Sequence, residues 1–173
     1  MSQIKVRQIV NANVYLEGMD MLGQAEEVKI PEISVIESEY KGLGMVGKIK
    51  LPAGIDAMEA EIKWKSYFEE AMRRVANPFA AVQVQIRSNV EDWDSTGRQR
   101  ERPLVTYLTV LTKKVMGSTF KQQERTDFPS SYNVHYIRQV FDGNEELEVD
   151  VFNNIFKING QDALAQYRLN IGG

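Results

Sequence analysis

Hydrophobic and polar residues alternate along much of the segment from residue 28 to residue 62. In its first part, apolar side chains recur at every second or third position on both sides of Pro31. Such alternation is typical of a β-strand with one buried face. Because proline lacks a backbone N–H, we expect an edge strand, a kinked strand or two short pieces here. A second alternating run, over residues 58–64, predicts another strand whose polar face carries glutamate and lysine.

A glycine-punctuated loop separates these two patterns and leads into a short apolar run that ends in a turn at residues 52–54. The residues of interest in this loop are Tyr40, Gly42, Leu43, Gly44, Met45, Val46 and Gly47. A monomeric protein ordinarily places polar side chains at a loop tip, so apolar side chains there indicate a contact surface. The loop is therefore predicted to touch a partner.

The periodicity changes after Trp64. Ser66, followed three residues later by Glu69, matches a capping box at the start of a helix. Apolar residues then recur at helical spacing along one face, at Phe68, Ala71, Met72 and Val75. The pattern ends at Asn77, because proline at the next position disfavours the helical conformation in the residue before it. This segment is the principal helix that the sequence predicts.

Most of the remaining chain carries strand patterns. The predicted strands cover residues 14–16, 80–87, 104–116, 132–141 and 146–156. The last two flank Asp142 and Gly143, a dipeptide that favours a tight hairpin turn. Polar segments predict loops at residues 91–102 and 122–131, and residues 162–168 are expected to form one or two helical turns. The predicted class is mainly β (α+β): a sandwich or barrel-like fold with one principal helix and a long extended loop or hairpin.

Composition agrees with one folded domain. The chain has 173 residues, of which 43% are hydrophobic and 26% charged. We expect a single domain over residues 1–173, with an N-terminal arm over about residues 1–11 and a C-terminal segment over about residues 158–173. The net charge is −3 with both signs mixed, whereas gripping nucleic acid requires a clustered basic face. The absence of cysteine, of a signal-peptide pattern and of a long apolar run predicts a soluble intracellular protein without a membrane anchor.

Motifs for cofactor and metal chemistry are weak. Gly42, Gly44 and Gly47 match the spacing G-x-G-x-x-G, but a dinucleotide site needs a helix after the last glycine, and a strand pattern follows here. His135 is the one histidine and lies in a strand pattern without an evident nucleophile or metal partner. With a single histidine and no cysteine, a zinc site of the usual kind is excluded. We therefore predict no cofactor and no metal.

Charged residues also recur at every second position. The carboxylate pairs are Glu59/Glu61, Asp92/Asp94 and Glu146/Glu148, and the arginines are Arg98, Arg100 and Arg102. A glycosidase would need two carboxylates with separated pKa values across a cleft, which these pairs do not indicate. The arginines lack the interleaved aromatic residues of a nucleic-acid groove. Solvated strand and loop surfaces explain both patterns, so no catalytic residue and no enzymatic activity are predicted.

Several motifs, in order along the chain, carry a resemblance to a known family. They are ANVYLEG at residues 12–18, IPEI at 30–33, EYKGLGM at 39–45, IDAMEA at 55–60, and INGQDALA at 158–165 with RLN at 168–170. In this order and at these separations they resemble the major tail tube protein of contractile-tailed temperate phages. The same family supplies the tube of R-type pyocins.

This resemblance implies a structural virion protein. Members of the family form hexameric rings that stack into the inner tube of a contractile tail, a conduit for DNA ejection whose wall is a continuous β-barrel. The implied partners are the protein itself and the tail sheath, tape-measure, baseplate and tail terminator proteins, with DNA passing through without specific binding. The implied location is the virion tail, after assembly in the host bacterial cytoplasm. Unpaired strand edges and a head-to-tail stacking contact are physically consistent with such a polymer.

Two alternatives stay open from the sequence. One is the tube subunit of a phage-tail-like bacteriocin or of a type VI-like contractile injection system. The other is a small β-sandwich binding module or glycan hydrolase, which predicts a monomer with an aromatic patch or a carboxylate cleft.

The resemblance also implies roles for particular residues. The family's inter-ring loop corresponds to residues 39–54, with Leu43, Met45 and Val46 buried in the assembled tube. The following strand, residues 56–64, belongs to the barrel, and its possible lumen-facing residues are Glu59, Glu61 and Lys63. An acidic-leaning lumen would repel DNA phosphates and let the genome slide. The loop departs from the family's double glycine, and residues 121–132 match no family motif, which leaves the sheath-facing surface undefined.

Overall fold

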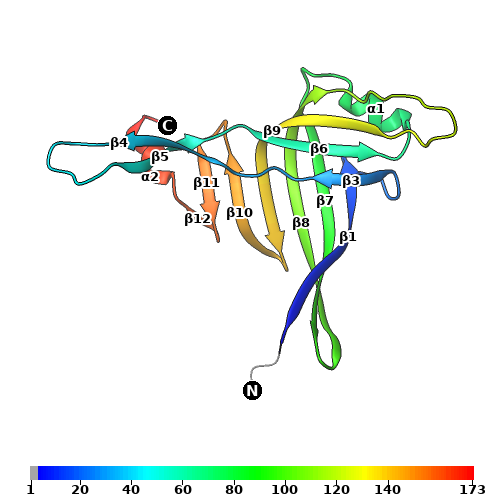
Figure 1. Cartoon of the computed structure of the whole chain (residues 1–173), viewed down its shortest axis with the longest axis horizontal. Helices are drawn as coiled ribbons and strands as arrows, with labels where there is room; N and C mark the ends of the chain where they lie inside the picture. The colour runs from blue at the N-terminus through cyan, green and yellow to red at the C-terminus, as the bar shows by residue number, and fades with distance from the viewer. Residues whose placement is uncertain (1–3) are drawn as a thin grey trace.

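The computed structural model describes residues 4–173, and antiparallel strands dominate it, which confirms the mainly β class (Figure 1). The strands of the larger sheet are β1 (Val6–Leu16), β2 (Met19–Asp20), β3 (Ala25–Lys29), β6 (Met58–Trp64), β7 (Val82–Asp94), β8 (Gly97–Lys114), β9 (Phe128–Phe141), β10 (Asn144–Asp150), β11 (Ile155–Ile158) and β12 (Gln161–Asp162). A separate two-stranded sheet consists of β4 (Val35–Tyr40) and β5 (Ile49–Ile55). The helices of the described chain are α1 (Glu69–Val75) and α2 (Ala165–Asn170).

The long strand β9 organises the larger sheet. One edge of β9 pairs with β8 along most of its length. Its other edge pairs first with β6, from Phe128 to Val134, and then with β10, from Tyr136 to Phe141. The sheet continues through β8, β7 and β1 on one side and through β10, β11 and β12 on the other. Because β6 and β10 share one edge of β9, β6 and its partner β3 lie across one end of the sheet (Figure 1).

The core lies between β6, the adjoining halves of β7, β8 and β9, and α1. The predicted alternation of β6 is confirmed, since Met58, Ala60, Ile62 and Trp64 are all buried. Strands β7 and β8 supply further inward-facing residues: Val82, Val84, Ile86, Leu108 and Val110. Burying one large apolar side chain contributes about 1.5–3 kcal/mol, so this cluster is the main source of stability.

Three two-residue turns form with residues in the left-handed conformation, and the one at Asp142-Gly143 was predicted. Asp142 and Gly143 have φ angles of 51° and 82° and join β9 to β10. Positive φ at both central residues matches the twist of a two-residue hairpin, which glycine and aspartate tolerate. Glu17-Gly18 and Asn159-Gly160 adopt similar φ angles between β1 and β2 and between β11 and β12. The predicted helical turns near the C-terminus are confirmed as α2.

The largest difference from prediction concerns residues 91–102. They were expected to form a loop, but they extend β7 and β8 to a tight turn at residues 95–96. The expected arm is also mostly strand, because residues 6–11 belong to β1 and pair with β7; residues 1–3 lie outside the described chain. Together these segments form a projecting polar ribbon: residues 6–11, 88–94 and 97–104 (Figure 1). Water covers both faces of much of this ribbon, so the period-2 apolar pattern that reports one buried face is weak there.

The structure also differs from the prediction at the start of a helix and at several strand ends. Helix α1 begins at Glu69 after an N-cap at Phe68 that makes no side-chain bond, so the capping box predicted from Ser66 is wrong. The chain before α1 is instead held by the Lys65 backbone N–H, which donates to the Gln24 carbonyl. The expected strand over residues 146–156 is two strands, β10 and β11, separated by a turn. Strand β9 begins at Phe128, inside a segment that was expected to be a loop.

Candidate assembly site

The hairpin of β4 and β5 stands apart from the rest of the molecule. Residues 30–34, which contain Pro31, carry no regular structure and separate β3 from β4, so the two-piece alternative for this region is the one observed. The Asp56 backbone N–H donates to the Ser34 carbonyl and closes the base of the hairpin at 2.8 Å. In Figure 1 the hairpin extends sideways from the larger sheet, with its tip at residues 41–48 farthest from the core.

Apolar side chains at the hairpin tip are exposed to solvent. The exposed fraction reaches 107% for Leu43 and 109% for Val46, whereas Met45 at 39% is partly covered. Strand residues Val35, Ile36, Ile49 and Leu51 are also about half exposed. An apolar surface of this extent on a projecting element is typical of a protein contact site. The role of the tip in contacts stays a prediction.

Local geometry gives the hairpin a defined shape. Lys48 pairs with Glu39 at 2.7 Å and Lys50 pairs with Glu37 at 3.0 Å, across the two strands. Gly44 has a φ of +84°, which only glycine adopts without strain, so this position fixes the tip turn. Exposed ion pairs contribute little free energy, and an isolated two-stranded hairpin is only marginally stable in water. A surface that covers the hairpin would therefore stabilise it more than its own ion pairs do.

The polar face of β6 carries the predicted lumen residues. Glu59 and Glu61 are exposed, and Lys63 is partly covered. Glu59 forms an ion pair with Lys113 of β8, while Lys63 lies 3.2 Å from Asp127 and 3.7 Å from Glu26. The hydrogen bond to Asp127 and the charges of both carboxylates raise the pKa of Lys63. Among the three predicted residues, Glu61 thus keeps the charge that no described side chain neutralises.

This face continues as a polar surface over the neighbouring strands. Its members on β7, β8 and β9 include Gln83, Gln85, Arg87, Tyr107, Thr109 and Asn133. The strand register places them on the side of the sheet opposite the buried residues. The surface mixes charges of both signs with neutral polar groups.

Carboxylates and arginines of the polar ribbon form two clusters of ion pairs, one around Asp92 and one around Arg98. Asp92 accepts bonds from Arg7 at 2.6 Å and from Arg102 at 2.5 Å, and Arg102 stacks over the Phe141 ring at 4.5 Å. The hydrogen bond from Arg7 is the largest cause that lowers the pKa of Asp92. Arg98 pairs with Glu91 and Glu101. The ion pairs therefore connect β1 to β7 and β8. Each of the three carboxylates, on Glu91, Asp92 and Glu101, is paired with an arginine.

The other residues considered for chemistry lie in structural settings. Strand β5, and not a helix, follows Gly47, so the geometry of a dinucleotide loop is missing. His135 packs edge-on against Phe152, with 5.0 Å between the ring centres. Glu148 accepts bonds from Lys157 and Tyr136, and the bond from Lys157 is the largest cause that lowers its pKa. Within residues 4–173 there is no cluster of three metal-ligating side chains, and neither helix has the length and apolarity to cross a membrane.

Comparison with known proteins assigns the family. The family model described as phage tail tube protein FII matches residues 6–172. The chain belongs to this family. The tail tube protein of Escherichia phage P2 is 29% identical over 170 residues, which cover 96% of this chain and 97% of that protein. The resemblance seen in the sequence motifs is thereby confirmed.

Family membership fixes the general role of the protein. A phage tail tube protein is a structural component of the virion tail. It self-assembles into a tube and associates with other tail proteins.

Two features of the site were not foreseen from sequence. The Arg7–Asp92–Arg102 network joins three strands, and a groove lies between the base of the hairpin and α2. Both combine segments that are far apart along the chain, and no local pattern signals such a contact.

Proposed function

We propose that this protein forms hexameric rings that stack into the inner tube of a contractile tail, which serves as the conduit for DNA ejection. The observation that carries the proposal is the projecting hairpin, whose tip residues Leu43 and Val46 are fully exposed. Leaving these side chains in water is unfavourable, and a neighbouring subunit that covers them recovers about 25 cal/mol per Å² of apolar surface. The residues that make this contact are Tyr40, Gly42, Leu43, Gly44, Met45, Val46 and Gly47.

The edge of β1 offers a second assembly surface, within a ring. One edge of β1 pairs with β7, and in the described chain β2 pairs with the other edge only at Tyr15 and Leu16. An unpaired edge is a template for a strand from another chain. Val10, with 74% of its surface exposed, lies on this part of β1. Pairing between neighbours would close six subunits into a ring and leave no free edge.

The polar face of the sheet suits the lumen of such a tube. Glu59, Glu61 and Lys63 of β6 face this lumen, together with the polar residues of β7, β8 and β9 on the same side. Ion pairs neutralise Glu59 and Lys63, so the face carries no basic cluster that would bind phosphate. DNA then passes through without specific binding.

In this proposal residues 1–173 form a single tail tube domain with a C-terminal segment over about residues 158–173. Its partners besides itself are the sheath, tape-measure, baseplate and tail terminator proteins, and assembly takes place in the host bacterial cytoplasm. A tube of a phage-tail-like bacteriocin or of a type VI-like system would use the same contacts and differ in what passes through the lumen.

Electron microscopy of negatively stained protein, with light scattering over a concentration series, tests the proposal. We expect stacked rings with a central hole, and loss of these polymers in Val46→Asp, because a buried unpaired carboxylate at the contact is unfavourable. Leu22→Asp is the matched control, since Leu22 is also exposed at 72% but lies away from the hairpin. The free energy of unfolding of each variant should differ from that of the wild type by less than about 0.5 kcal/mol, because neither site is buried.

The opposite results would contradict the proposal. One is a Val46→Asp variant that forms rings and tubes as readily as the wild type. Another is a wild-type chain that stays monomeric at every concentration, even when it is expressed together with the baseplate proteins of its own tail.

A further inference from the structure

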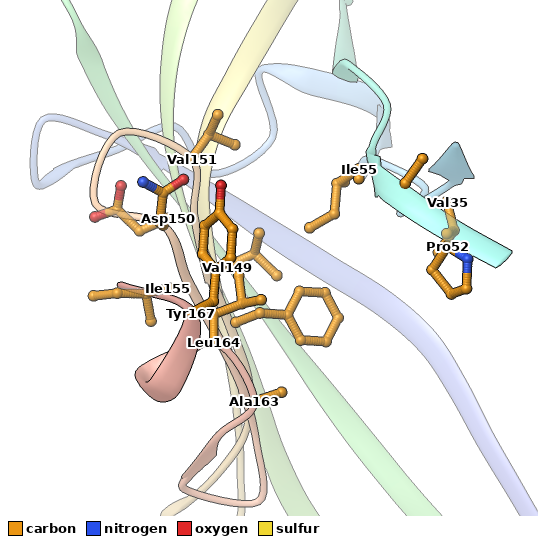
Figure 2. Close-up of a pocket in the computed structure, with 14 residues that line it drawn as sticks. Val35, Pro52, Ile55, Val149, Asp150, Val151, Ile155, Ala163, Leu164 and Tyr167 are labelled. Atoms are coloured by element: carbon orange, nitrogen blue, oxygen red, sulfur yellow. The ribbon is translucent and has the colours of Figure 1, made fainter. Parts of the chain in front are cut away.

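A groove with a volume of about 560 Å³ lies between the base of the β4–β5 hairpin and the C-terminal part of the chain. Figure 2 shows its two walls, one from the hairpin and one from β10, β11 and the region of α2. The side chains that define it are mostly apolar: Val35, Pro52, Ile55, Val149, Val151 and Tyr167. Val149 is buried, whereas Val151 and Tyr167 are half exposed at the rim.

The lining of the groove favours apolar side chains over a small polar ligand. Small-molecule sites fix their ligand with a few converging polar groups. Here the Asp150 carboxylate accepts bonds from the backbone N–H of Asn153 at 3.1 Å and from its side-chain amide at 2.7 Å. These bonds hold the turn after β10 and leave the apolar walls as the main contact surface.

We infer that the groove receives the hairpin tip of a second copy of this chain, with Leu43 and Val46 packed between its walls. The inference rests on the proposed stacking of subunits and identifies the surface that accepts the tip. The tip presents fully exposed apolar side chains, and the groove is an apolar depression with room for several of them. A chain that carries both surfaces is complementary to itself.

Charge supports the same pairing. Near the tip, Lys48 and Lys50 are paired with glutamates of β4, whereas Lys41 has no ion-pair partner within residues 4–173. At the groove, the side-chain carboxylate of Asp150 bonds only to Asn153 and has no cationic partner in the described chain. Seating the tip in the groove brings these two unpaired charges of opposite sign to one interface, where complementarity selects partner and register.

Geometry makes the contact intermolecular. The tip and the groove lie at opposite ends of one hairpin, whose strand β5 has seven residues. A strand rises about 3.3 Å per residue, so roughly 20 Å separate the tip from the groove of the same chain. Each copy therefore donates a tip to one neighbour and accepts a tip from another. A head-to-tail contact forms a ring if the rotation between copies closes and a filament if it does not, and in the proposed stacking it propagates along the tube axis.

Disulfide trapping tests this arrangement, because the sequence contains no cysteine. A Leu43→Cys variant is mixed with a Val151→Cys variant under conditions in which the wild-type chain assembles, and the mixture is oxidised. We expect a mixed disulfide dimer to form about tenfold faster than in a mixture of Leu43→Cys with Phe79→Cys, owing to the high effective concentration at a real contact. Each variant alone should form little dimer, because the contact joins two different surfaces.

A charge exchange provides an independent readout. Lys41→Asp should raise the concentration needed for assembly about fivefold, and adding Asp150→Lys in the same chain should restore much of the loss. A structural role of Asp150 in its turn could not produce such a rescue.

The outcomes separate this inference from the proposed function. Tubes that form without the Leu43–Val151 cross-link overturn the inference and leave the tube function standing. A cross-link from Val151→Cys to Val10→Cys in place of Leu43→Cys would make the edge of β1 the occupant and would also overturn it. If neither polymers nor cross-links form, both the proposed function and the inference fail.

Discussion

Ser130 is the centre of a fully buried hydrogen-bond network in the core. The indole N–H of Trp64 donates to its Oγ at 3.0 Å, and the Tyr132 hydroxyl lies 2.7 Å from the same atom. Ser130 in turn donates to the Ile62 carbonyl at 3.1 Å. Burial raises the pKa of Tyr132 to about 12, so this hydroxyl stays protonated and available as a donor. One small side chain therefore satisfies the polar groups of two large aromatic residues.

We expect Ser130→Ala to lower the free energy of unfolding by about 3 kcal/mol, because it leaves two buried donors without an acceptor. Tyr132→Phe removes one bond but orphans no other donor, so its expected cost is only about 1 kcal/mol. Ser131→Ala, at the next position on the opposite face, is the control and should change stability by less than about 0.5 kcal/mol. Urea denaturation of the three variants gives the comparison. Equal effects of Ser130→Ala and Tyr132→Phe would show that the serine does not organise the network.

At the scale of elements, the polar ribbon depends on charge more than on burial. Its three strands are held by ladder hydrogen bonds and by the network of Arg7, Asp92 and Arg102. The pKa of Asp92 is lowered first by its bond with Arg7, and that of Glu91 first by its bond with Gln8. A carboxylate with a lowered pKa stabilises the folded state above its unfolded pKa of about 4 and loses this contribution as the pH falls through the lowered value.

Acid should therefore release the N-terminal half of β1 before the core unfolds. We expect amide hydrogen exchange at Val6 to Ile9 to accelerate, relative to core amides, as the pH drops below about 4. Asp92→Asn should show the faster relative exchange already at neutral pH and a weaker dependence on acid. Glu146→Gln on β10 removes one exposed negative charge away from the ribbon and serves as the control. Unchanged ribbon exchange in Asp92→Asn would assign the stability of the ribbon to its backbone ladder alone.

At the scale of the whole molecule, the sheet has two different faces. One face covers the core, and the other presents the polar side chains of β6 to β9. In the proposed tube this polar face turns inward, while the hairpin and the edge of β1 meet neighbouring subunits. The hairpin and β1 lie at different ends of the molecule (Figure 1), and the polar face belongs to the sheet, so each surface can serve its own contact.

A single cysteine at Glu61 distinguishes the lumen from the outer surface. In the free chain, Glu61→Cys should react with both a small maleimide and a maleimide carried on a long polymer, because this position is exposed. In assembled tubes we expect the small reagent to enter the lumen, whereas the polymer-bound reagent should react about tenfold more slowly, because the tube wall excludes its bulk. If the two reagents label intact tubes with the same ratio of rates as they label the free chain, this face lies on the outside of the tube.

Local chemistry was enough to predict much of this protein. The alternation of β6 reports one buried face, Asp142-Gly143 imposes a tight turn, and the apolar residues at positions 43, 45 and 46 lie exposed at the tip of a hairpin. That this tip is a contact surface stays a prediction. Each of these features depends on residues that are neighbours in sequence, so it can be predicted without knowledge of the fold. The motif order likewise identified the tail tube family.

Tertiary structure alone decided the rest. Residues 91–102 form strands because β1 and the arginine network pair with them, although their two-sided exposure hides the strand pattern. The capping box predicted at Ser66 does not form, because α1 begins only at Glu69 and Phe68 occupies its N-cap position. The groove joins the hairpin base to β10 and α2, segments about a hundred residues apart. Contacts between such distant segments depend on long-range packing, so the pattern of hydrophobic and polar residues along the chain does not predict them.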